Sequence, residues 1–319
     1  MGLPAYLTLL CPLAAGPLAR LLGDRLDPRR ATWLLTAAAV LLAGTSCGAL
    51  GLLSLSALVR VPLVARLGEL SPAVLTSGDP TETGIALVAG VLFGAALLAT
   101  AAFAVRRARA LADARRHARG LPGKGSLVIT RDESADAYTV PGRPSRIVVS
   151  RGMLDALDDA GRAALLAHER AHLDGRHYLY TSAVRLAAAA NPLLRPLADA
   201  VEYTIERWAD ERAAAHIGDR GTVARAIARA ALAAKASGQR PGPVPALGAV
   251  FARGGAGASP AHGIGPVPRR VAALLGPPPL RRPATTALTL LFLVFVILCA
   301  LHAADNLQDV LSLAHVEGG

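Results

Sequence analysis

Four stretches of the chain are apolar for long enough to cross a lipid bilayer as helices. A membrane-spanning helix needs about 20 consecutive, mainly apolar residues. The stretches of about this length are residues 3–22, 32–58, 84–105 and 284–304. Pro12 and Pro17 lie inside the first stretch, so we expect its helix to bend. A signal peptide is the alternative for this stretch, but its basic residues follow the apolar run instead of preceding it.

Residues 106–283, between the third and fourth stretches, have the mixed pattern of a folded domain. Three short runs in it are typical of strands: residues 126–130, 137–140 and 146–150. Pro141-Gly142 indicates a turn between the second and third runs. A strongly helical region covers 158–235, and the Gly/Pro-rich residues 236–268 predict a loop.

We therefore expect a mainly α, polytopic membrane protein with a small β-hairpin or meander. Its parts are a membrane domain over 1–105, a folded domain over 106–283, and a final span with a short tail over 284–319. Residues 178–198 are apolar enough to resemble a fifth span, but Arg185 and two prolines make a single crossing costly. We expect this segment to form an amphipathic hairpin or helix on the membrane or against the core.

Basic residues are concentrated beside the apolar stretches and predict the orientation. They follow the first and third stretches and precede the fourth: Arg25, Arg29, Arg30, Arg106, Arg107, Arg109, Arg115, Arg116, Arg119, Arg281 and Arg282. The positive-inside rule then places residues 106–283 in the cytoplasm and both termini outside it. We expect a multi-pass protein of the cell membrane, with the lipid bilayer as its first partner.

Composition narrows the classes of function. The net charge of +11 invites a nucleic-acid partner, but the arginines after the third stretch have no aromatic residues among them to stack bases. We therefore expect no direct binding of nucleic acid. Cys11, Cys47 and Cys299 lie in apolar stretches without metal-ligand spacing, which argues against a disulfide framework and a Cys-ligated metal. The stretches contain almost no ionisable residues, which argues against a transporter.

His168-Glu169-Arg170-Ala171-His172 is the sharpest chemical signal in the sequence. On a helix, positions i and i+4 share a face, so both imidazoles can bind one zinc ion. Glu169 can act as general base, taking a proton from water and passing it to the leaving amine. The alternative is a surface helix with two solvated histidines. The pattern predicts a zinc-dependent metalloendopeptidase that holds one Zn²⁺ per chain and uses Glu169 in catalysis.

A catalytic zinc ion usually has three protein ligands, so a third must lie elsewhere. The metzincin arrangement fails, because the position that requires the third histidine is Tyr178. Glu206 is the better candidate, since Glu202, Glu206 and Asp210 recur at four-residue steps and share a helix face. Glu206 would bind zinc, and Asp210 would fix the tautomer of a ligand histidine. Ordinary salt bridges with neighbouring arginines are the alternative.

Other residues are weaker candidates. His177, His262 and Arg269 carry groups that can stabilise a developing oxyanion, although solvated or structural roles explain them as well. Residues 138–143 can pair with an extended substrate backbone, or can be an ordinary core hairpin.

The run of YTVPG (138–142), VVS (148–150) and HERAH (168–172) resembles membrane-bound gluzincin peptidases. Two related groups fit: the HtpX and CAAX-prenyl-protease group, and the BlaR/MecR antirepressor group. Three spans, a cytoplasmic protease domain and one final span are more similar to the BlaR/MecR type. The resemblance covers roughly residues 84–304. It implies zinc ligands His168, His172 and Glu206, with Glu169 as the base and Asp210 beside a ligand.

The resemblance also implies a substrate. The antirepressors cut a cytoplasmic repressor, so a protein of the BlaI/MecI repressor type is one expected partner, and quality-control proteolysis of the HtpX type is the alternative. This chain departs from the antirepressors, because residues 305–319 are far too few for a penicillin-binding sensor domain. A non-catalytic membrane receptor or scaffold that retains the peptidase frame is the alternative from another class. Nothing in the sequence specifies the oligomeric state.

Overall fold

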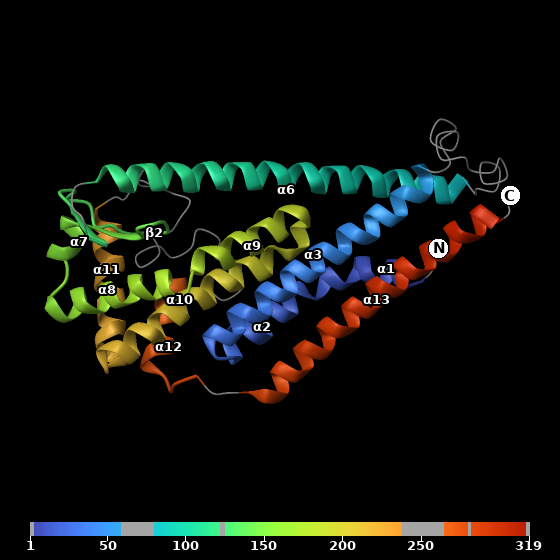
Figure 1. Ribbon diagram of the computed structural model, residues 1–319. Coiled ribbons are helices and arrows are strands. Elements are labelled where there is room, and N and C mark those ends of the chain that lie inside the picture. Colours follow the sequence, from blue (N-terminus) through green and yellow to red (C-terminus); the bar gives the residue numbers. More distant parts are fainter. Residues whose placement is uncertain (1–2, 59–79, 122–124, 238–264, 280–281, 317–319) are drawn as a thin grey trace.

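A computed structural model of the protein describes residues 3–58, 80–121, 125–237, 265–279 and 282–316. The molecule is elongated, with long helices at one end and a small sheet with shorter helices at the other (Figure 1). Helix α6 (Pro80–Gly120) runs along most of its length. Most of the predicted loop 236–268, including His262, lies outside the described residues.

Within the described residues, four segments are long and apolar enough to cross a membrane, as predicted. They are Tyr6–Arg25, Pro28–Leu55, Gly84–Gly120 and Pro283–His302. The helices involved, besides α6, are α1 (Leu3–Leu10), η1 (Cys11–Ala14), α2 (Ala15–Arg25), α3 (Pro28–Leu58) and α13 (Pro283–Val316). The 3₁₀ turn η1, with Pro12 at its start, interrupts the first span where a bend was expected.

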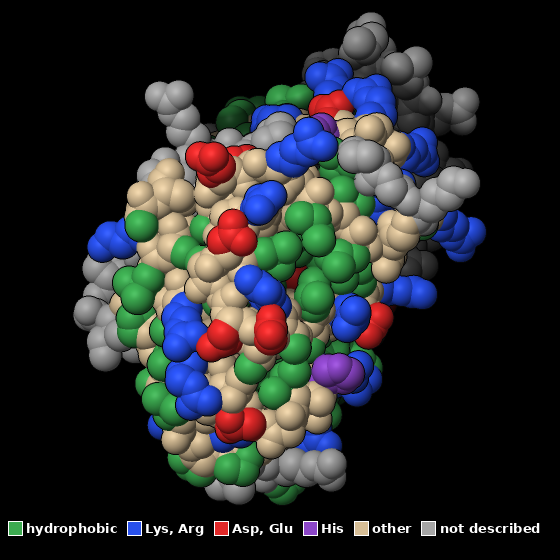
Figure 2. All heavy atoms as spheres, turned by 90° about the vertical axis from the view of Figure 1, so that its left-hand side faces the viewer, with side chains coloured by type: hydrophobic (Ala, Val, Ile, Leu, Met, Phe, Trp, Pro, Cys, Tyr) green, Lys and Arg blue, Asp and Glu red, His purple; other side chains and the backbone are tan. Residues whose placement is uncertain are grey.

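The outer faces of α6 and α13 carry large exposed apolar side chains. Leu98 of α6 is 74% exposed and Leu291 of α13 is 66% exposed. A water-soluble protein rarely leaves large apolar faces uncovered, whereas the hydrocarbon of a bilayer accommodates them. The opposite end of the molecule instead shows charged side chains of both signs between apolar ones (Figure 2). This asymmetry fits a membrane protein with a water-exposed end.

The small sheet has three strands, β1 (Leu127–Thr130), β2 (Ala137–Val140) and β3 (Arg146–Ser150). β2 and β3 form the predicted antiparallel hairpin, with Tyr138 opposite Val148. β1 lies on the other side of β3 and is parallel to it, so the strand order is β1-β3-β2 and the sheet is not a meander. β2 is therefore an edge strand.

The remaining helices surround the sheet or extend from it towards the spans. They are α7 (Arg151–Asp155), α8 (Asp159–Asp174), α9 (His177–Ala190), η2 (Pro192–Leu194), α10 (Arg195–Ile217), α11 (Arg220–Ala236) and α12 (Pro266–Leu275). Asp158 caps α8 by accepting a hydrogen bond from the Gly161 amide at 2.8 Å. Such a cap satisfies an amide that the first helical turn leaves without a helical partner. α8 packs against β2.

Helices α9 and α10 form a hairpin that packs against the spans. Asn191, at its tip, donates a hydrogen bond from Nδ2 to Ser46 Oγ of α3 at 3.3 Å. Thr32, near the start of α3, donates to Thr204 Oγ1 of α10 at 3.0 Å. The two contacts lie about 20 Å apart along α3. The apolar segment 178–198 is thus one part of a hairpin packed on the core, one of the two arrangements that the sequence favoured.

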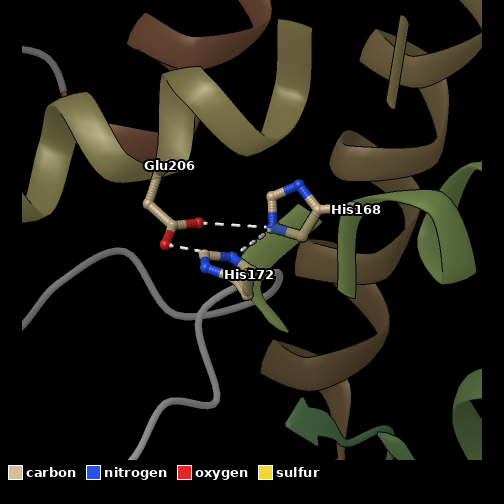
Figure 3. Close-up of side chains that lie close together, drawn as sticks. All are labelled: His168, His172 and Glu206. Atoms are coloured by element: carbon tan, nitrogen blue, oxygen red, sulfur yellow. Dashed lines mark hydrogen bonds and ion pairs between the residues drawn. The ribbon is translucent and has the colours of Figure 1, made fainter. Parts of the chain in front are cut away.

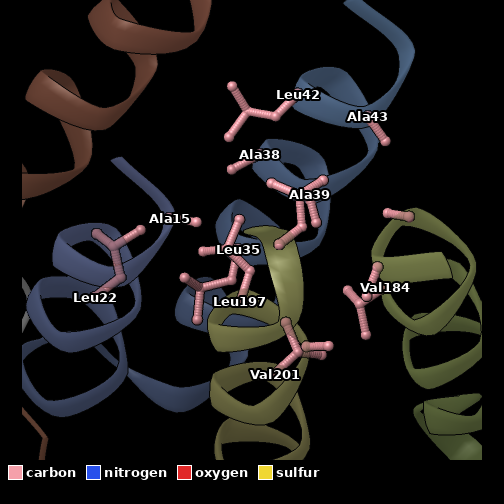
Figure 4. Close-up of a cluster of buried hydrophobic side chains, with 14 of the residues drawn as sticks. Ala15, Leu22, Leu35, Ala38, Ala39, Leu42, Ala43, Val184, Leu197 and Val201 are labelled. Carbon is pink, nitrogen blue, oxygen red and sulfur yellow. The ribbon is translucent and has the colours of Figure 1, made fainter. Parts of the chain in front are cut away.

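Two hydrophobic clusters share α10. The membrane-side cluster joins α2, α3, α9 and α13 to the first half of α10 (Figure 4), and includes Leu22, Leu35, Leu42, Val184, Leu197, Val201 and Ile205. The sheet-side cluster joins the sheet, α8, α11 and α12 to the end of α10, and includes Val149, Leu165, Ala213, Ile227 and Leu274. The predicted domain over 106–283 therefore shares a core with the spans.

Candidate metal centre

Helix α8 presents the two histidines of the HERAH motif on one face. The Nε2 atoms of His168 and His172 lie 3.0 Å apart. They face the same point because the residues are one helical turn apart. The side chain of His168 is fully buried and that of His172 is 11% exposed. This pair is therefore part of the interior, which excludes the alternative of two solvated surface histidines.

Helix α10 adds a carboxylate to the histidine pair (Figure 3). Glu206 Oε2 is 3.5 Å from His168 Nε2, and Glu206 Oε1 is 3.5 Å from His172 Nε2. Zinc bonds of about 2.0–2.1 Å in a tetrahedral site hold the ligand atoms roughly 3.4 Å apart. Two imidazole nitrogens and one carboxylate are also a known donor set of catalytic zinc. His168, His172 and Glu206 therefore lie close enough to bind one metal ion.

Asp210, one helical turn after Glu206, contacts the far side of His168. Its Oδ1 atom is 3.0 Å from His168 Nδ1. Burial lowers the pKa of His168, but hydrogen bonds to Asp210 and Glu206 outweigh burial and raise this pKa to about 9. The same carboxylates would stabilise a cation at His168 Nε2. A proton on Nδ1, shared with Asp210, leaves the Nε2 lone pair for a metal.

Arg270 of α12 completes this charged group and was missed by the sequence analysis. Its Nε and Nη2 atoms lie 2.8 and 2.6 Å from the two oxygens of Asp210, and Nη1 lies 3.1 Å from Glu206 Oε2. Burial alone would raise the pKa of both carboxyl groups, but the Arg270 charge outweighs burial and lowers both. Arg270 therefore keeps Glu206 and Asp210 ionised inside the protein.

A pattern in the sequence points to Arg270. Val267, Arg270 and Leu274 recur at helical spacing, and Val267 and Leu274 belong to the sheet-side cluster. An arginine on the apolar face of a short helix requires a buried acidic partner. The predicted residue Arg269 instead lies 2.8 Å from Asp24 Oδ1 and stacks over Tyr203 at 4.2 Å, so it contacts α2 and not the metal ligands.

His177, the first residue of α9, contacts His172. The two Nδ1 atoms are 2.8 Å apart. Burial lowers the pKa of His177 to about 3, so its ring is neutral and can accept the hydrogen of His172 Nδ1. His172 Nε2 then remains for the metal. A Cβ at Gly175 would lie only 2.3 Å from His177 Nε2, so the absence of a side chain there makes room for the ring. The contact indicates that His177 orients His172.

Glu169 is 3% exposed and lies next to His168 in the motif. Burial has the largest effect on the Glu169 carboxyl group and raises its pKa to about 7. The charges of Glu206 and Asp136 also raise this pKa, whereas the charges of His168 and Arg270 lower it. A carboxylate whose pKa is near neutrality suits proton transfer at physiological pH.

Comparison with known proteins identifies one related family. The model for peptidase family M48 matches residues 104–198, from α6 through the sheet and α8 to the start of α10. The match includes the HERAH motif, whereas Glu206 and Arg270 lie beyond its end. No curated protein and no solved structure matches the chain significantly. The similarity supports a metallopeptidase with apolar helices suited to a membrane, without distinguishing the BlaR/MecR type.

Proposed function

We propose that this protein is a membrane-embedded zinc metalloendopeptidase that cuts a cytoplasmic or juxtamembrane protein. The observation that carries the proposal is the convergence of His168, His172 and Glu206 within 3.5 Å of one another, with Glu169 buried beside them. The cost of burying these charged groups favours the peptidase over a non-catalytic scaffold, which has no use for a metal ion at them.

The residues around the metal centre take distinct roles in this proposal. Zinc at the three ligands would polarise the scissile carbonyl and lower the pKa of a water molecule toward about 7. Glu169 accepts a proton from the attacking water and transfers it to the leaving nitrogen. Asp210 and His177 hold the two histidines in the tautomer that presents Nε2. A gluzincin site of this kind needs no further protein ligand.

The free edge of β2 supports the binding of an extended substrate. In an antiparallel pair, alternate residues direct their N–H and C=O groups to the partner strand. Asp136 accepts a hydrogen bond from Ser150 N, so the amides of Ala137 and Thr139 point to the other side. Among the described residues no strand pairs there. A substrate strand added to this edge would run beside α8 and Glu169.

We further propose that the centre lies near the cytoplasmic surface of the membrane. The Arg29 guanidinium is 5.1 Å from the ring of Trp33 in α3 and 5.6 Å from that of Trp208 in α10. Trp is enriched where a bilayer meets water, and arginine where that water is cytoplasmic. The Trp208 ring is 4.5 Å from His177. This position favours a bond close to the bilayer, so a repressor of the BlaI/MecI type would have to dock against the membrane.

Zinc content and proteolysis, measured together on the full chain in mild detergent, test the proposal. We expect about one zinc per chain in the wild type and in Glu169→Gln, and a clear loss in Glu206→Ala. Cleavage of an unfolded protein such as casein should fall by roughly 10²–10⁴ in Glu169→Gln. Glu211→Gln is the control, because Glu211 lies on the same helix as Glu206 but pairs with Arg220 of α11, away from the metal ligands. A well-folded, zinc-free wild type, or unchanged cleavage by Glu169→Gln, would overturn the proposal.

A further inference from the structure

A small hollow lies between the end of α6 and the turn that joins β2 to β3. Four arginines line it, Arg115 and Arg119 from α6, and Arg143 and Arg146 from the turn and the start of β3. We call these residues, with the turn Pro141–Pro144, the arginine hollow. Basic side chains also gather at the upper edge of the water-exposed end, where α6 ends (Figure 2).

Arg115, Arg119 and Arg143 give the arginine hollow its positive charge, and no described acidic residue forms a salt bridge with them. Arg115 donates from Nε to the Pro141 carbonyl, and Arg146 donates from Nη1 to the Leu121 carbonyl, each at 2.9 Å. The Pro141 carbonyl is neutral, so this contact positions the Arg115 guanidinium without cancelling its charge. Arg119 and Arg143 are exposed, and neither forms a salt bridge with a described acidic residue. An anion is the ligand that this arrangement fits.

The arginine hollow lies at the far end of the proposed substrate edge. β2 begins next to Asp136, whose charge acts on Glu169, and ends at Val140, which lines the hollow. At about 3.3 Å per residue, β2 spans roughly 13 Å from one end to the other. A substrate strand that runs antiparallel to β2 therefore carries its residues N-terminal to the scissile bond towards the arginines. A parallel strand would carry its C-terminal residues there.

A polypeptide fits the arginine hollow better than a lipid headgroup does. The apolar run of α6 ends at Val105, and Arg115 follows about 15 Å further along the helix. Arg119 lies further still from the bilayer. An acidic segment of a bound polypeptide can reach the arginine hollow, because the edge strand leads to it.

We propose that the arginine hollow binds acidic side chains of the substrate, about three to six residues N-terminal to the scissile bond. This inference rests on the proposed peptidase function and names its substrate class: proteins with an Asp/Glu-rich segment before the cleavage site. Exposed charge pairs are individually weak, so the preference arises from several arginines acting together.

Quenched fluorescent peptides, cleaved by the full chain in detergent, test this selectivity. Three peptides share a cleavable centre and carry glutamates on the N-terminal side, glutamates on the C-terminal side, or glutamines throughout. We expect kcat/KM to be about five- to tenfold higher for the first than for the third, with the gain lost at high salt. The double variant Arg119→Gln/Arg143→Gln should abolish this gain, so that the first and third peptides are cleaved with equal kcat/KM.

A matched control keeps the test specific. Arg109→Gln/Arg116→Gln removes the same charge from exposed positions of α6 outside the hollow, and should retain the preference. Equal cleavage of all three peptides, or an acidic preference that survives in Arg119→Gln/Arg143→Gln, overturns the subsite but not the peptidase. A preference for glutamates on the C-terminal side overturns the antiparallel direction. Absence of cleavage of every peptide by zinc-loaded wild type overturns the peptidase itself.

Binding of a nucleic acid is the remaining alternative. A labelled oligonucleotide whose binding is lost in Arg119→Gln/Arg143→Gln, without a change in peptide selectivity, would replace the acidic peptide as the ligand of the hollow.

Discussion

The membrane-side and sheet-side clusters are built from similar side chains but are stabilised in different ways. The sheet-side cluster is surrounded by charged surface, such as the pair of Asp158 with Arg229, so release of water from apolar groups drives its formation. The membrane-side cluster is surrounded by exposed leucines that lipid accommodates. Helices there associate through close packing and hydrogen bonds such as Thr32–Thr204.

Helix α10 shows what this difference means for the metal centre. Leu197 and Val201 belong to the membrane-side cluster, and Ala213 belongs to the sheet-side cluster. Glu206 and Asp210 lie on the same helix between the two. The histidines come from α8, which packs within the sheet-side cluster. The geometry of the centre therefore depends on how firmly α10 joins the two regions.

The largest effect is expected where the two regions meet, at Arg270. In Arg270→Gln the carboxylates of Asp210 and Glu206 lose their buried partner, which should lower the free energy of unfolding by about 3–5 kcal/mol. Zinc should bind roughly 10–100-fold more weakly. Chemical denaturation and a chelator competition measure the two quantities. Arg269→Gln, which removes a partly exposed pair, should cost less than about 1 kcal/mol, and equal losses would contradict the assignment.

A paired substitution compares the two clusters directly. Leu165 and Leu197 are both fully buried, one in each cluster. Leu165→Ala should lower the free energy of unfolding by about 2–5 kcal/mol, because the removed methyl groups no longer contribute their transfer free energy and leave a cavity. Leu197→Ala should lower the free energy of unfolding by about half as much. Separated membrane helices leave a leucine in lipid, which is as apolar as the protein interior, so the transfer contribution is small. Unfolding in detergent, followed by far-UV circular dichroism, measures both, and the reverse order would refute the distinction.

The contact of His177 with His172 is expected to matter for the metal more than for the fold. His177→Phe should weaken zinc binding about 10–100-fold, since His172 loses the group that fixes its tautomer. Thermal unfolding of the zinc-free protein should change little, because Phe retains the ring packed on Trp208. His177→Gln restores an acceptor and should recover part of the affinity. Full zinc affinity in His177→Phe would remove the positioning role.

The smallest effect is expected at the tip of the α9–α10 hairpin. Asn191→Ala removes a hydrogen bond to Ser46, and such bonds between membrane helices contribute about 0.6 kcal/mol on average. A double-mutant cycle with Ser46→Ala should give a coupling energy below about 1 kcal/mol. A coupling of several kcal/mol would show that the hairpin is held mainly by this contact and not by apolar packing.

The parts of the fold that follow from local pattern were predictable from the sequence. Span length, the bend near Pro12 and the helix that carries HERAH depend on residues close together in the chain. Glu206 was also predictable, because its four-residue spacing to Asp210 defines a helix face. The structure brings Glu206 to the histidines, while its binding of zinc stays a prediction.

The remaining features depend on packing between distant segments. Whether Arg269 or Arg270 turns inward is decided by the side of α12 that meets Asp210, which lies on another helix. The parallel pairing of β1 with β3 depends on the route of the intervening chain and not on strand composition. The hairpin packs along the spans because apolar side chains of α9 and α10 join α2, α3 and α13 in the membrane-side cluster, and Asn191 and Thr204 add hydrogen bonds to α3.

Helix α6 is long enough to carry a movement in the membrane to the sheet. It is one unbroken helix of 41 residues, about 60 Å long, of which a bilayer needs roughly half. A rotation of about 10° at the membrane moves the far end of such a rod by roughly 10 Å. Spans tilt to match the thickness of the surrounding lipid. We therefore expect a change in bilayer thickness to tilt α6 and to displace its far end, which packs against β2.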